Sequence, residues 1–237
     1  MGTPRPASKE WLLDVTKALL RRCGPKVLEA REHDPRRFEL GEGGLENALR
    51  EVFLLFDADI HGTVREGAQS SRMGLHPIGM RDDEVLFTWR GAGEPHGADV
   101  VLAVVSWWRS ESGLRVSDAD TERQLCAVMA VMLGFGRVLI GHADDENAVF
   151  CLADLCYLLA VRSLARGDGW FAMWRLRRSL PRPARAIYIE GLRGLLRPYG
   201  RLAWRVGLPK TDRFGDAARL QIGSHGLRHA PDEEESP

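Results

Sequence analysis

Apolar residues recur at helical spacing in two segments near the start of the chain. The first runs from Trp11 to Leu20, where Ser8 precedes the run and Gly24 follows it. Ser is a favoured N-cap residue and Gly a favoured helix terminator, so the pattern predicts a capped first helix. The second run spans residues 45–56 and places its apolar side chains on one face, which predicts an amphipathic helix.

The strongest helical signal begins at Asp118. Asp118 and Asp120 are typical N-cap residues, and residues 124–136 carry no charge at all. A helix that is apolar on every side belongs inside a core. A polar break at His142 leads into a second long apolar segment. We therefore predict a central buried helical hairpin near residues 120–141 and 145–166.

The remaining segments give weaker signals. Residues 57–82 have no sustained period, so we expect an irregular loop. Two short apolar runs lie within residues 83–108, and periodicity leaves open whether they form a short β-hairpin or buried helices. A short helical turn is expected at residues 170–174 and an amphipathic helix at 185–197. The sequence predicts a single helical domain over residues 1–208 and a polar, disordered tail over 209–237.

The composition is that of a globular protein. The 237 residues are 44% hydrophobic, and 33 basic side chains balance 33 acidic ones. Neutrality disfavours a general nucleic-acid binder, which needs a basic surplus. We expect no signal peptide and no membrane span, because the uncharged stretch of residues 124–136 is shorter than the roughly 18 residues needed to cross a bilayer. Four cysteines in apolar runs indicate reduced thiols, so we predict a cytoplasmic protein.

The basic residues are almost all of one kind, since 29 of the 33 are arginine. Arginine makes planar, bidentate contacts with carboxylates, which suggests a role at interfaces. A GC-rich genome would produce the same bias. The sequence leaves both explanations open.

Candidate catalytic chemistry is sparse. The string from Leu54 to Thr63 resembles the strand and Asp-x-Asp-Gly-Thr motif of haloacid-dehalogenase-type phosphatases, with Asp57 as nucleophile and Asp59 beside it, but Ile60 and His61 interrupt the motif. The histidines and cysteines have no zinc-ligand spacing. We find no phosphate-binding glycine loop and no basic stripe with interleaved aromatic residues. We therefore predict no catalytic residue, no metal and no cofactor, and we keep the metal-dependent phosphatase as a remote alternative.

The order of helices resembles the Bcl-2 family of apoptosis regulators, in which amphipathic helices surround a buried hairpin. The first helix carries Glu10, Asp14, Leu20 and Gly24 at positions similar to those of the family's fourth homology motif. Residues 48–53 resemble the start of the third motif.

Two further matches lie beyond these helices. Arg123 falls where the first homology motif has its arginine, and residues 167–170, Gly-Asp-Gly-Trp, are similar to the second motif. In the first motif the family has Asn-Trp-Gly before the arginine, whereas this chain has Asp120-Thr-Glu.

The resemblance implies a Bcl-2-like helical bundle and an apoptosis regulator, expected to be an inhibitor, that binds amphipathic death-motif helices of pro-apoptotic proteins in a hydrophobic groove. In the family, the arginine that Arg123 would represent pairs with an aspartate of the ligand helix. The resemblance also suggests a divergent viral member acting on its host, with a peripheral location at mitochondria. The candidate ligand-helix-binding residues are Arg123, Val104, Trp107, Trp108, Val128, Phe135 and Trp170.

A second hypothesis keeps the helices but changes their use. In it the protein is a non-enzymatic adaptor or structural protein of a viral or cellular assembly. We expect a β-hairpin formed by the two runs in residues 83–108 to favour this hypothesis over the apoptosis regulator.

Overall fold

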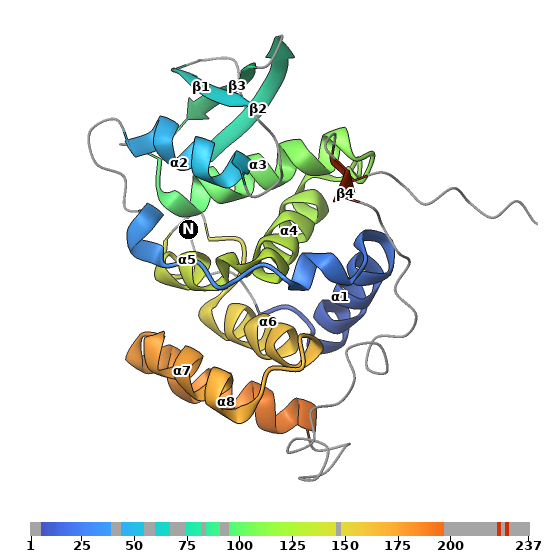
Figure 1. The fold of residues 1–237 in the computed structure, drawn as a ribbon, viewed down its shortest axis with the longest axis vertical. Coiled ribbons are helices and arrows are strands. Elements are labelled where there is room, and N and C mark those ends of the chain that lie inside the picture. Colours follow the sequence, from blue (N-terminus) through green and yellow to red (C-terminus); the bar gives the residue numbers. More distant parts are fainter. Residues whose placement is uncertain are drawn as a thin grey trace, which may run out of the picture.

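The computed structural model describes residues 6–38, 44–54, 60–66, 74–81, 84–90, 95–145, 148–196, 222–223 and 226–227. Most of these residues are helical, as predicted, and a small sheet accompanies the helices (Figure 1). The α-helices are α1 (Lys9–Cys23), α2 (Gly44–Leu54), α3 (Gly97–Glu111), α4 (Ala119–Ala130), α5 (Gly136–Gly141), α6 (Leu152–Ala165), α7 (Trp170–Ser179) and α8 (Arg182–Leu196). Shorter helical segments are η1 (Pro25–Leu28), η2 (Pro35–Phe38) and the π-helical η3 (Val131–Phe135).

Capping interactions of neighbouring residues define both ends of helix α1. The side chain of Ser8 accepts a hydrogen bond from the backbone N–H of Trp11 at 3.5 Å. Gly24 has a φ of 72°, a left-handed conformation that glycine adopts without strain, and its N–H donates to the carbonyl of Leu20. Both predicted ends of the first helix are confirmed.

The prediction of an irregular loop at residues 57–82 is wrong for most of this segment, because the segment contains two strands. Strands β1 (His61–Glu66) and β2 (Gly74–Arg81) flank β3 (Glu84–Arg90), with β1 parallel and β2 antiparallel to β3. Pairing partners and the helices that cover the sheet are distant in sequence, so local pattern does not reveal them. At Gly62, an added Cβ would lie 3.0 to 3.2 Å from three side chains, so the glycine permits close packing.

The ambiguous runs within residues 83–108 separate into two kinds of structure. The first run forms β3, and the second lies in α3. Strand β3 forms its hairpin with β2, not with residues 99–108. The hairpin that was expected to favour the adaptor hypothesis is therefore absent from this segment.

The central apolar segment forms a buried helix with an interruption. Asp118 caps α4 by accepting a hydrogen bond from the N–H of Thr121 at 2.8 Å, as predicted. The chain then passes through η3, where Gly134 has a φ of 99°, and continues as α5. Helix α6 packs against η3 and α5, and it begins seven residues after the predicted position 145 because turns occupy residues 142–145.

One helical run among the described residues, Ala119–Gly141, is long and apolar enough to cross a membrane. However, 72% of its apolar window is buried inside the protein, as in the core helix of a globular protein. A single buried run of this kind is weak evidence for a span.

The elements form a stack from the sheet to the last two helices. Figure 1 shows the sheet with α2 and α3 at one end, α1, α4, α5 and α6 in the middle, and α7 with α8 at the other end. Helix α8 packs on α6, and α7 packs on α8. Helix α7 is longer than the predicted turn at 170–174. Of the predicted tail, only the short pair β4 (Ile222–Gly223) and β5 (Gly226–Leu227) is described.

Candidate interaction face on helices α7 and α8

The residues predicted to line a groove do not share one open surface. Five of them have at most 8% of their surface exposed and belong to the core: Val104, Trp107, Trp108, Val128 and Phe135. Helix α3 is buried because α2, α4 and β2 all pack against it. The Trp107 ring meets Phe53 edge to face, and Phe135 stacks on His33 with ring centroids 4.3 Å apart. These five side chains therefore act as packing residues in this structure.

Two predicted residues are exposed, on separate elements. Arg123 lies on the outer side of α4. Trp170 begins α7 and exposes 62% of its surface. The candidate phosphatase residues Asp57 and Asp59 lie outside the described residues.

Helix α7 turns large aromatic side chains away from the core. Its buried residues are Met173 and Leu176, which lie on one side of the helix. Trp170 and Phe171 expose 62% and 61% of their surfaces, and Trp174 is half-buried. The outer side of a surface helix is normally polar, so this placement is unusual. We call Trp170, Phe171, Trp174, Arg175 and Arg178 the aromatic–arginine face.

The aromatic–arginine face is internally organised. The rings of Phe171 and Trp174 stack with centroids 5.8 Å apart and an interplanar angle of 24°. The guanidinium of Arg175 lies 4.9 Å from the centroid of Phe171, and that of Arg178 lies 4.6 Å from the centroid of Trp174. Such cation–π contacts hold arginine beside an apolar ring while its N–H groups remain available to an anion.

The charge of this region departs from the neutrality of the whole chain. Residues 170–196 contain six arginines and one acidic residue, Glu190, so their formal charge is +5. Five of those arginines are exposed: Arg175, Arg177, Arg178, Arg182 and Arg193. The expectation that the chain has no basic stripe with interleaved aromatic residues is thus wrong at residues 170–178. The interleaving is visible in the sequence, whereas the exposure of the rings is not.

The sixth arginine, Arg185, fixes α7 relative to α8. Its Nε donates to the carbonyl of Leu180 at 2.8 Å, and its second nitrogen donates to the carbonyl of Arg178 at 3.0 Å. These carbonyls belong to the last turn of α7 and to its C-cap residue, where helical carbonyls lack intrahelical donors. Arg185 thereby holds the aromatic–arginine face on a rigid support.

Helix α8 is in turn held tightly against α6. The hydroxyls of Tyr188 and Ser163 form a buried hydrogen bond of 2.9 Å. At Gly191, an added Cβ would lie 3.3 Å from the Cβ of Ala160, so glycine allows the two helices to approach closely. The last two helices are therefore a fixed part of the domain.

A different arrangement surrounds the buried arginine of α3. Arg109 is 1% exposed and donates to both carboxylate oxygens of Glu122, at 2.8 and 3.0 Å, and to the carbonyl of Leu114 at 2.8 Å. Glu122 also accepts from the N–H of Val116. Although burial acts against it, the hydrogen bonds from Arg109 keep the pKa of Glu122 below its ordinary value. This bidentate pair joins the end of α3 to the start of α4.

A second buried arginine anchors the segment between η1 and η2. Arg162 of α6 is 1% exposed and donates to the carbonyl of Met132 at 2.8 Å, to the carbonyl of Ala30 and to Glu32. Arg166 also donates to the carbonyl of Ala30. Burial raises the pKa of Glu32 to about 7, while Arg162 and Arg166 act in the opposite direction. These contacts tie residues 30–32 to α6, and Arg162 also connects α6 to η3 through Met132.

The buried thiols among the described residues are not activated as nucleophiles. Burial raises the pKa of the thiols of Cys23, Cys126 and Cys156 to about 12, so they are protonated at neutral pH. No group of three or more His, Cys, Asp or Glu residues suited to a metal ion occurs in this part of the chain.

Comparisons with protein-family models, with curated proteins and with solved structures found no match to this chain. The geometry of its own surfaces therefore carries the functional argument. On the aromatic–arginine face, exposed aromatic side chains and exposed arginines occur together.

Proposed function

We propose that this protein acts by binding, as a non-enzymatic adaptor, and that the aromatic–arginine face of α7 attaches it to an anionic partner. The observation that carries the proposal is the outward placement of Trp170, Phe171 and Trp174 between arginines. Tryptophan and arginine are the residue types that contribute most binding energy at interfaces. An acidic partner surface would complement the +5 formal charge of residues 170–196.

A polyanion column tests this proposal on the full chain. Heparin-agarose is expected to retain the protein, and the double variant Arg175→Gln/Arg178→Gln should elute at a clearly lower salt concentration. The matched control is Arg36→Gln/Arg37→Gln, which removes the same charge from two exposed arginines of η2. Equal elution of the wild type and the α7 variant would refute the proposal, as would equally early elution of the η2 control.

A second candidate function is the one that the Bcl-2 resemblance implies, namely binding of an amphipathic death-motif helix. The observation in its favour is the pair of buried central segments, α4 to α5 and α6, with other helices around them. Against it, the sheet β1 to β3 has no counterpart in that resemblance, and five proposed groove residues are core residues.

Calorimetry with a panel of death-motif peptides tests this second candidate. If Arg123 meets a carboxylate of the ligand, Arg123→Ala should weaken binding by about 1.5 to 3 kcal/mol. No detectable binding of any peptide to the wild type would exclude this function, and unchanged affinity of the variant would exclude the assigned role of Arg123.

A further inference from the structure

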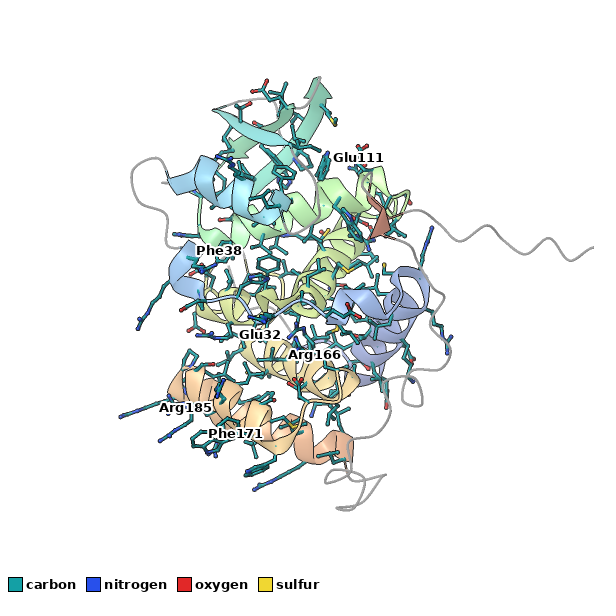
Figure 2. The ribbon with its side chains drawn as sticks, in the orientation of Figure 1. Glu32, Phe38, Glu111, Arg166, Phe171 and Arg185 are labelled. Carbon is teal, nitrogen blue, oxygen red and sulfur yellow. The ribbon has the colours of Figure 1, made fainter. Side chains whose placement is uncertain are left out.

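The aromatic–arginine face projects from one end of the molecule. In Figure 1, α7 and α8 form the end opposite the sheet, and no other labelled element covers α7 on its outer side. Figure 2 labels Phe171 at this end of the molecule, where it exposes 61% of its surface. Aromatic rings that project from a protein surface can insert into a partner whose surface deforms around them. Such a partner needs no preformed pocket.

The pairing of the rings disfavours nucleic acid as that partner. Single-stranded nucleic acid is bound by stacking bases on open aromatic faces. Here Phe171 and Trp174 stack on each other, and Arg175 and Arg178 lie over their rings. The faces of Phe171 and Trp174 are therefore already in contact with other side chains.

The charges around the rings fit a planar anionic surface. Arg175 and Arg178 lie over the rings of Phe171 and Trp174, and Arg177 and Arg182 are also exposed in this segment. The acid Asp168, which precedes α7, is already paired with Arg166 at 3.2 Å. Aromatic residues beside basic ones on an amphipathic helix are the composition of helices that lie in the headgroup region of a bilayer.

We infer that the anionic partner is the surface of a lipid bilayer containing acidic phospholipids, an inference that rests on the proposed function of this face. Helix α7 lies along the membrane plane, with Trp170 and Phe171 entering the headgroup and acyl boundary. Arg175 and Arg178 contact lipid phosphates while remaining against the rings of Phe171 and Trp174. The +5 formal charge of residues 170–196 supplies the electrostatic attraction.

Co-sedimentation of the full-length protein with sucrose-loaded vesicles tests this inference. We expect binding to vesicles of 70% phosphatidylcholine and 30% phosphatidylglycerol, much weaker binding to pure phosphatidylcholine, and loss of binding as salt is raised. Each arginine near such a surface contributes roughly a fivefold factor, so Arg175→Gln/Arg178→Gln should lower the partition coefficient about 25-fold. Trp170→Ala/Phe171→Ala should lower it at least about tenfold.

Two matched controls separate this site from general effects. Arg36→Gln/Arg37→Gln removes equal charge elsewhere, and Ile78→Ala/Met80→Ala removes exposed apolar side chains of β2. Both should bind like the wild type, and circular dichroism should show that every variant is folded. Equal loss in a control variant would overturn the inference, and so would equal binding to the two kinds of vesicle.

The heparin column and the vesicle experiment together distinguish failure of this inference from failure of the proposed function. Retention on heparin that depends on Arg175 and Arg178, without vesicle binding, would leave the proposed function standing and assign the face to a soluble acidic macromolecule instead of a membrane. If the wild-type protein bound neither heparin nor anionic vesicles, both the proposed function and this inference would be refuted.

Discussion

Two sets of arginines in this protein have opposite surroundings. Arg109 and Arg162 are 1% exposed, and fixed carbonyl or carboxylate oxygens accept their N–H groups. Arg175 and Arg178 lie at the surface against aromatic rings. The buried arginines join elements that are distant in sequence, whereas the exposed ones leave their donors available to a partner. The same type of side chain therefore stabilises the fold in one region and, as we propose, binds a partner in the other.

The largest effect is expected at Arg162. In Arg162→Ala, Glu32 loses its partner and the carbonyl of Met132 loses its donor, so the free energy of unfolding should fall by about 3 to 5 kcal/mol. Urea unfolding followed by circular dichroism measures it. If Arg162→Ala lowered the free energy of unfolding no more than Arg178→Ala does, the buried and exposed arginines would not differ in their contribution to stability.

The carboxyl partner of Arg162 should make stability depend on pH. Burial raises the pKa of Glu32 in the folded protein to about 7, above its ordinary value of 4.5. Between these two pH values the folded protein keeps a proton on Glu32 that the unfolded chain has released. The stabilisation is complete below about pH 4.5 and is lost as the pH rises through 7, with a size of up to about 3 kcal/mol.

Thermal unfolding between pH 5 and 8 checks this dependence. Glu32→Gln should flatten the profile, while the control Asp34→Asn, at a half-exposed carboxyl, should leave it unchanged. A profile in Glu32→Gln that still matches the wild type would assign the titration to another group.

A conservative exchange at Arg109 distinguishes geometry from charge. Lysine keeps the charge but cannot donate to both oxygens of Glu122 and to the carbonyl of Leu114, so Arg109→Lys should cost about 1 to 3 kcal/mol of stability. Chemical denaturation provides the measurement, with Arg175→Lys as the surface control. Equal stability of both variants would show that the bidentate geometry is unimportant.

The smallest effect on stability is expected at the exposed set. Arg175→Gln/Arg178→Gln loses two exposed cation–π contacts, so the free energy of unfolding should change by no more than about 1 kcal/mol. Differential scanning calorimetry checks this. A change comparable to that of Arg162→Ala would mean that these arginines also maintain the fold.

The sequence predicts features of the fold that depend on neighbouring residues. The caps at Ser8 and Asp118 and the buried central segment all follow from local composition and spacing. The strands β1 and β2 escape prediction because β3 and the covering helices stabilise them through contacts remote in sequence. The late start of α6 likewise depends on turns that a helical period does not encode.

The candidate site is only partly accessible from sequence. The order of aromatic and arginine residues over 170–178 is printed in the chain, and Trp170 was singled out as a binding residue. The resemblance assigns Trp170 to a ligand groove. Periodicity does not say which side of a short helix meets the core, so the sequence does not reveal that Trp170 is exposed. The same limit explains the choice of Arg123 and the omission of Arg109 and Arg162, since an arginine's burial depends on tertiary packing.

The kink at Gly134 limits which residues this chain tolerates in the middle of its core. Gly134 has a φ of 99°, and an added Cβ there would collide with the backbone carbonyl of Arg31. Any other residue would combine a strained backbone with a clash against the segment that Arg162 anchors. The bend between α4 and α5 therefore depends on one residue that has no side chain.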